Sequence, residues 1–105
     1  MNSVILTKDA DKTLCILYKE YLSRRKDNIS KFNASQIEES YFDILFPNQN
    51  NDDLIEELIE LKNNGLITLD IAGNVRLHTN AIIYMENRFK NGLSEVVDFI
   101  TKFIP

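Results

Sequence analysis

Apolar residues recur at helical spacing along most of the chain, beginning with a broad stripe near the N-terminus. The members of this stripe are Leu14, Leu17, Tyr18, Tyr21 and Leu22. Their spacing predicts an amphipathic helix over residues 7–26. Thr7 can accept hydrogen bonds from the amides of the first turn. Arg24, Arg25 and Lys26 come at the end of the helix, where cations are favoured by the negative pole of the helix dipole.

A second helix is expected over residues 33–46. Asn33 followed by Gln36 resembles a variant capping box, and Pro47 must end the helix because it has no backbone donor. The apolar residues expected on its inner side are Ile37, Tyr41 and Ile44. Residues 29–32, with Ile29 and Phe32 as their apolar members, are expected to form a short extended link that could add a strand to a neighbouring sheet.

The clearest helix is predicted over residues 51–64, followed by a β-hairpin. Asn51 is the expected cap, and Gly65 ends the helix in the left-handed manner typical of glycine. The expected inward stripe consists of Leu54, Ile55, Leu58, Ile59 and Leu61. Residues 66–77 then read as two short strands joined by a tight turn at residues 72–74.

Two further helices are expected, over residues 79–91 and 93–104, separated by a break at Asn91 and Gly92. The first has Ile82, Met85 and Phe89 on one side. The apolar residues of the second are Leu93, Val96, Val97, Ile100, Phe103 and Ile104. This stripe is wide enough either to pair with a second copy across a two-fold axis or to cover its own domain. The fold class is therefore mainly α with a small β-hairpin.

Three helices followed by a two-stranded hairpin is the element order of a winged helix-turn-helix domain. The stretch Leu61–Ile67 and the later stretch Arg76–Glu86 are similar to a pattern of bacterial and prophage winged helices, L-x-x-x-G-L-I followed by L-T-x-x-G-x-x-Y-L-E. In particular the chain resembles the YjcQ-like family of small winged-helix proteins. It departs from the pattern at His78, where Thr is usual, and at Ala81, where Gly is usual. The resemblance implies a winged helix and leaves the ligand open.

Composition adds few constraints beyond these. A chain of 105 residues with 44% apolar and 27% charged residues fits one globular domain. Cys15 is the only cysteine, so no disulfide can form within the chain, and this favours a reducing, cytoplasmic location. From the sequence we expect no signal peptide, no lipidation and no membrane-spanning segment.

Charge is distributed unevenly along the chain. Residues 1–32 have seven basic and four acidic side chains, residues 33–70 have one and nine, and residues 71–105 have four and three. The acidic segment contains the helix that a DNA-binding winged helix inserts into the major groove. Glu56, Glu57 and Glu60 are expected on its outer face, and they would repel phosphates. They are either an ordinary solvated surface, a contact for a basic protein partner, or a mimic of the charge of DNA.

Nucleic acid could instead be contacted by basic residues elsewhere. One candidate cluster is Arg24, Arg25, Lys26 and Lys31, and a second, near the hairpin, is Arg76, Arg88 and Lys90. The alternative is that the first cluster only completes its helix and stays solvated.

The residues that could support catalysis are few and scattered. His78 is the only histidine, and it is expected to cap a helix or pack at the end of a strand. Cys15 falls in an apolar stripe and is expected in the core. No metal site, cofactor motif or phosphate-binding glycine loop is expected, so an enzyme is disfavoured.

Two functions remain after this reasoning. A transcription-regulator type of winged helix that contacts DNA outside its third helix is slightly favoured, by analogy with the use of the fold. The alternative is a protein-interaction module that uses the acidic helix or the apolar C-terminal helix.

Overall fold

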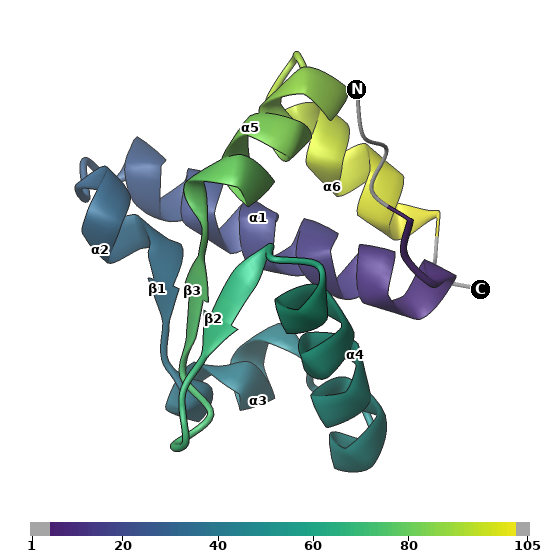
Figure 1. Cartoon of the computed structure of the whole chain (residues 1–105). Coiled ribbons are helices and arrows are strands. Elements are labelled where there is room, and N and C mark those ends of the chain that lie inside the picture. The colour runs from purple at the N-terminus through teal and green to yellow at the C-terminus, as the bar shows by residue number, and fades with distance from the viewer. Residues whose placement is uncertain (1–4, 103–105) are drawn as a thin grey trace.

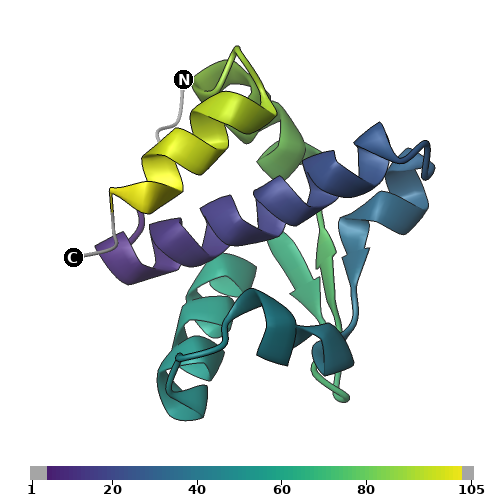
Figure 2. The same ribbon diagram turned by 180° about the vertical axis from the view of Figure 1, so that it is seen from behind.

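The structure is a computed structural model that describes residues 5–102. Its elements are α1 (Lys8–Lys26), α2 (Lys31–Ser35), β1 (Gln36–Ile37), the 3₁₀ turn η1 (Glu39–Tyr41), α3 (Phe42–Leu45), α4 (Asn51–Asn63), β2 (Ile67–Leu69), β3 (Val75–Leu77), α5 (Thr79–Arg88) and α6 (Leu93–Thr101). The chain is thus mainly helical with a small antiparallel sheet, as predicted. In Figures 1 and 2, α1 crosses the middle of the molecule, with α5 and α6 on one side and the sheet, α3 and α4 on the other.

The three strands form a sheet in the order β1-β3-β2. β3 pairs antiparallel with both neighbours, so Arg76 lies opposite Gln36 on one side and Thr68 on the other. The turn between β2 and β3 is held by the Asp70 carboxylate, which accepts hydrogen bonds from the backbone amides of Ala72 and Asn74 at 2.9 Å each. These bonds fix the shape of the hairpin tip.

The connection from α4 to β2 depends on Gly65. Its φ of 72° is in the left-handed region, which glycine adopts without steric cost. The amide of Gly65 donates to the carbonyl of Lys62, and the amide of Leu66 donates to the carbonyl of Leu61. This ending of the helix, as predicted, turns the chain so that α4 and the hairpin diverge from a common corner.

All parts of the fold contribute to one core around α1. The largest fully buried aliphatic side chains are Leu14, Leu17, Ile37, Leu61, Ile67, Val75, Met85 and Val96. Each such side chain stabilises the fold by roughly 1.5–3 kcal/mol relative to an exposed one. Because Val96 of α6 is among them, the C-terminal helix belongs to this core.

α6 packs along α1 of its own chain, which is one of the two alternatives expected for it. Leu93, Val97 and Ile100 are half-buried there. Phe103 and Ile104, which were predicted to continue the stripe, lie outside the described residues. A homodimer through the outer surface of α6 stays a prediction.

The helix predicted over residues 33–46 is wrong. Ser30 caps the short helix α2 by accepting a hydrogen bond from the amide of Asn33, and Gln36–Ile37 then forms β1. The backbone of Ile37 pairs with Val75, which no helix would allow. The extended link expected over residues 29–32 is also wrong for Lys31 and Phe32, which lie in α2. The third strand follows at Gln36–Ile37, and the helical turns resume at Glu39.

Two details of α4 also differ from expectation. Its cap is Asn50 and not Asn51, since the Asn50 side chain accepts from the amides of Asp52 and Asp53. Ile55 and Ile59, predicted to point inward, are 50% and 43% exposed. The inward face follows Leu54, Leu58 and Leu61, which are buried.

Candidate functional site

The three carboxylates predicted to form an acidic outer face on α4 have different environments. Glu56 is exposed. Glu57 is only 8% exposed and accepts hydrogen bonds from the hydroxyl of Thr13 and from Nε2 of Gln49, the latter at 2.9 Å. Burial raises the pKa of Glu57 above its ordinary value, although these hydrogen bonds act in the opposite direction. The prediction that Glu57 faces outward is wrong, because it shares the inner face of the helix with Leu54.

Glu60 also turns toward α1. Its Oε2 accepts from the backbone amide of Thr7 at 2.7 Å, and its Oε1 accepts from the Thr7 hydroxyl at 2.8 Å. The same hydroxyl accepts from the amide of Ala10 and so caps α1. Glu60 therefore joins α4 to the first turn of α1, and of the three predicted carboxylates only Glu56 is exposed to a partner.

A groove of about 610 Å³ opens between α3, α4 and the tip of the β2–β3 hairpin, and we call it the hairpin groove. Its lining residues are Glu39, Phe42, Asp43, Phe46, Asn51, Leu54, Ile55, Leu58, Leu69, Asp70, Ile71, Ala72 and Gly73. Phe42, Phe46 and Leu54 are buried, whereas Ile55 and Ile71 are exposed. Figure 1 shows α4 and the β2–β3 hairpin diverging from the connection between them, and residues of both line the groove.

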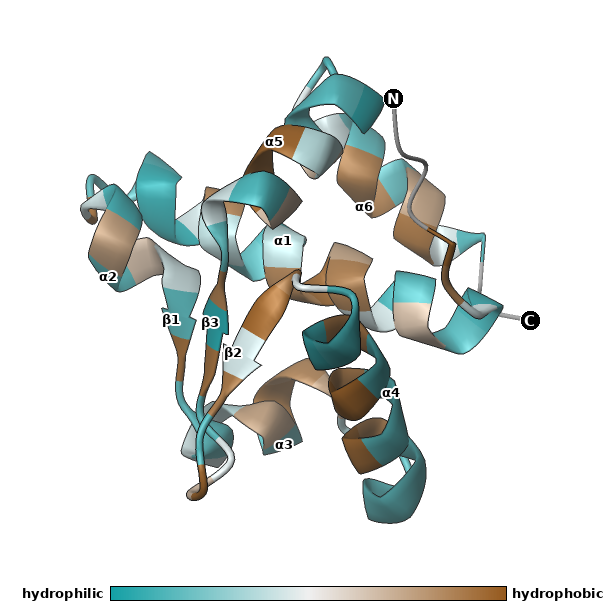
Figure 3. Cartoon of the chain, viewed as in Figure 1, coloured by the Kyte–Doolittle hydropathy of each residue, from teal (hydrophilic) through white to brown (hydrophobic). Residues whose placement is uncertain are grey.

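The exposed isoleucines make the hairpin groove apolar up to its rim. Ile71 at the hairpin tip is fully exposed (108%), and Ile59 continues the apolar surface from Ile55 along α4. Figure 3 shows hydrophobic colour both on α4 and at the hairpin tip. Single exposed apolar residues are common on protein surfaces, but groups of them that adjoin a groove mark binding sites.

The charged side chains that line the hairpin groove are all carboxylates. They are Glu39 and Asp43 from the segment η1–α3 and Asp70 from the hairpin, and neither lysine nor arginine is among the lining residues. Hydrogen bonds from the backbone of Asn74, together with further bonds across the turn, lower the pKa of Asp70, so it is ionised at neutral pH. The groove therefore combines apolar walls with negative charge.

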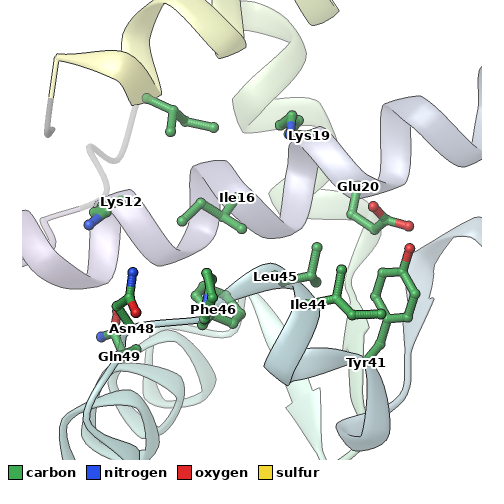
Figure 4. Close-up of a pocket in the computed structure, with 12 residues that line it drawn as sticks. Lys12, Ile16, Lys19, Glu20, Tyr41, Ile44, Leu45, Phe46, Asn48 and Gln49 are labelled. Carbon is green, nitrogen blue, oxygen red and sulfur yellow. The ribbon is translucent and has the colours of Figure 1, made fainter.

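A second groove, of about 490 Å³, lies between α1, residues 41–49 and α6, and we call it the α6 groove. The apolar residues that line it are Ile16, Ile44, Leu45, Phe46, Pro47 and Ile100. Figure 4 shows Ile16 between Lys12 and Lys19 on α1, facing Leu45 and Ile44. The one lining carboxylate, Glu20, is paired with Arg24 at 2.8 Å. This groove is thus flanked by cations, unlike the hairpin groove.

Arg24, predicted as a nucleic-acid contact, forms three contacts within the fold. Its Nε donates to Glu20 and its Nη1 donates to the carbonyl of Gln36 in β1, at 2.5 Å. Its guanidinium also lies 5.2 Å from the centre of the Tyr41 ring. These contacts tie the end of α1 to the first strand.

Arg88 has a similar structural role. It forms two hydrogen bonds with the carboxylate of Asp11, at 2.6 and 2.8 Å, and its guanidinium lies 4.9 and 4.6 Å from the ring centres of Phe89 and Phe99. The prediction that Arg88 joins Arg76 near the hairpin is wrong, because Arg88 is the last residue of α5 and pairs with Asp11 of α1, and α5 extends away from β3 (Figure 1).

The remaining predicted cations are exposed, and most of them lie at one end of the molecule. Arg25, Lys26 and Lys31 are exposed where α1 passes into α2, and Arg76 of β3 is exposed with its guanidinium 6.0 Å from the centre of the Phe32 ring. We call Arg25, Lys26, Lys31 and Arg76 the basic end. Lys90 is exposed separately, between α5 and α6.

The two residues considered for catalysis, His78 and Cys15, have contacts that serve the fold. His78 precedes α5, with Nδ1 3.0 Å from the carbonyl oxygen of Gly65 and Nε2 2.5 Å from the hydroxyl of Thr68. Cys15 is fully buried, and burial raises its pKa to about 12, so the thiol stays protonated and unreactive. Within residues 5–102, no three His, Cys, Asp or Glu side chains are placed to hold a metal ion. None of the described helices has the length and apolar character needed to cross a bilayer.

Sequence reasoning missed the residues that line the hairpin groove. Ile71 gave the clearest available signal, since an isoleucine between Asp70 and the turn at residues 72–74 has no core to enter. Glu39 and Asp43 gave none, because they belong to the segment that was assigned to one continuous helix.

Comparisons with known proteins identify no relative. No protein-family model, no curated protein and no solved structure matches the chain. The two grooves and the basic end are therefore the features that bear on function.

Proposed function

We propose that the chain is a winged helix-turn-helix domain that binds a protein partner through the hairpin groove. The winged-helix assignment is supported by the order α1, β1, α3, α4, β2, β3, by the sheet order β1-β3-β2 and by the direct passage from α4 into the hairpin through Gly65. A fold of this kind serves many functions, so the function rests on the surface.

One observation carries the proposal: the exposed side of α4 and the groove beside it are apolar and acidic. A DNA-binding winged helix inserts this helix into the major groove and needs cations around it to neutralise phosphates. Here the exposed side chains of α4 include Ile55, Glu56 and Ile59, and Lys62 is the one cation of the helix. Such a surface fits another protein better than a nucleic acid.

The test is capture of a partner from a lysate of the source cells with three immobilised proteins. These are the wild type, Ile71→Asp in the groove, and Ile83→Asp as a matched control on α5. Both isoleucines are exposed, so neither substitution should disturb folding, and the two variants have the same net charge. We expect a protein that the wild type and Ile83→Asp retain and that Ile71→Asp loses. Equal capture by all three proteins would contradict the proposal.

A second candidate function, binding to the DNA backbone, is supported by the basic end. Arg25, Lys26, Lys31 and Arg76 are exposed, and none of them lines the hairpin groove. If the basic end binds DNA, long duplex DNA should show a gel shift at about 50 mM salt, and the shift should weaken steeply as the salt concentration rises. Arg76→Glu should weaken the shift, whereas a charge change at Lys90 should matter less. An absence of any shift at low salt removes this candidate.

A further inference from the structure

We infer that the occupant of the hairpin groove is an extended, positively charged segment of the partner protein, which adds as a strand to the outer edge of β2. The inference rests on the proposed function, because it concerns the same groove. It adds the conformation and the charge of the bound segment.

The backbone of β2 supports strand addition. β2 is at the edge of the sheet. The carbonyl of Leu66 and the amide of Asp70 both bond across the hairpin toward β3, at 3.0 Å each. Backbone groups alternate in direction along an antiparallel strand, so those of Ile67 and Leu69 in β2 point to the other edge. Figures 1 and 2 both show that edge on the side of α4, and residues of α4 and of the hairpin line the groove.

The side chains around this edge suit an extended segment. Every second side chain of an added strand points to the same face, and one face would pack over Phe42 and Leu54, which line the groove. Ile55 and Ile71 would contact the segment from the two walls. Strand addition of this kind obtains affinity from backbone hydrogen bonds and specificity from alternate side chains.

Charge selects the other side chains of the segment. Glu39, Asp43 and Asp70 line the groove, and Asp52 and Asp53 are exposed in the first turn of α4 beside it. An acidic segment in contact with these carboxylates would be repelled, because salt screens charges only beyond about 8 Å at physiological ionic strength. Lysine and arginine are the residues that complement this rim.

The experiment selects peptides from a displayed library of random sequences, about 12 residues long, on the immobilised full chain. We expect enriched sequences to place apolar residues at alternate positions and to contain Lys or Arg. The dissociation constant of the most enriched peptide is then measured by fluorescence anisotropy. The double variant Glu39→Lys/Asp43→Lys should weaken binding about tenfold or more. The control Glu86→Lys/Asp98→Lys, with the same change in net charge on α5 and α6, should change it less than about twofold.

Backbone methylation tests the strand itself. Two versions of the enriched peptide have N-methyl groups on alternate residues, offset from each other by one position. In an added strand only one set of amides faces β2, so one version should lose binding and the other should retain it. Equal binding, or equal loss, by the two versions would overturn strand addition.

The remaining outcomes separate this inference from the proposed function. Enriched peptides that lack cations but do not bind Ile71→Asp would overturn the inference that the bound segment is positively charged. They would leave the groove as the binding site. Peptides that bind Ile71→Asp and the charge variant as well as the wild type would overturn both proposals. A library that yields no binder would overturn the inference alone, because capture of a folded partner tests the groove independently.

Discussion

The two faces of α4 have similar residues and opposite roles. On the inner face, Leu58 is buried and Glu57 accepts hydrogen bonds from α1 and from the loop before α4. On the outer face, Ile59 and Glu56 are exposed. Each face has aliphatic and carboxylate side chains, so composition does not distinguish them. Their positions relative to α1 and the hairpin decide which residues stabilise the fold and which are available to a partner.

The largest difference between the faces should appear in stability when one aliphatic side chain is shortened. Leu58→Ala leaves a cavity in the core and should lower the free energy of unfolding by about 2–4 kcal/mol. Ile59→Ala removes a side chain that is 43% exposed and should lower it by less than about 1 kcal/mol. Urea denaturation followed by circular dichroism measures both. Similar losses for the two variants would mean that the faces are not distinct.

A pH-dependent difference is expected between Glu57 and Glu56. Burial raises the pKa of Glu57 in the folded chain above its unfolded value. The stability contributed by its protonated form is therefore complete below the unfolded pKa and is lost as pH rises through the folded pKa. Glu57→Gln does not titrate, so its stability relative to the wild type should increase as the pH rises above the ordinary pKa of a glutamate, 4.5. Glu56→Gln should show no such trend. A flat comparison for Glu57→Gln would contradict its buried position.

The smallest difference should separate Glu60 from Glu56. Glu60→Ala removes two hydrogen bonds to Thr7 and should cost about 0.5–1.5 kcal/mol, since the site is partly exposed. Glu56→Ala should stay within about 0.5 kcal/mol of the wild type. A double-mutant cycle of Glu60→Ala with Thr7→Ala should give a coupling energy. Independent, additive effects would show that the contact does not stabilise the chain.

Much of the fold could be predicted from periodicity and caps. The apolar stripe of α1, the glycine after α4 and the hairpin turn each have a local signal that matches the structure. β1 has none: Ile37 is apolar at a position that fits a helix as well as a strand, and only its pairing with Val75 in β3 decides between them. For α4, the neighbours Leu54 and Ile55 are both apolar, so spacing alone does not say which one points inward.

The candidate site was less predictable, because it depends on contacts between distant segments. The sequence correctly indicates negative charge around α4, but Glu57 meets Thr13 and Glu60 meets Thr7, which are 44 and 53 residues away. No local pattern reveals such partners. The hairpin groove likewise brings together Asp43 of α3 and Ile71 of the hairpin turn, which are far apart in the sequence.

The most direct test of the central claim is a ¹⁵N–¹H NMR titration of the full chain with the enriched peptide and, separately, with duplex DNA at low salt. If the hairpin groove binds a protein segment, the peptide should shift the amide signals of Asp43, Ile55 and residues 69–73. Any shifts caused by DNA should be confined to the basic end. The account is contradicted if DNA shifts the outer face of α4 from Ile55 to Lys62, or if the peptide leaves residues 69–73 unchanged.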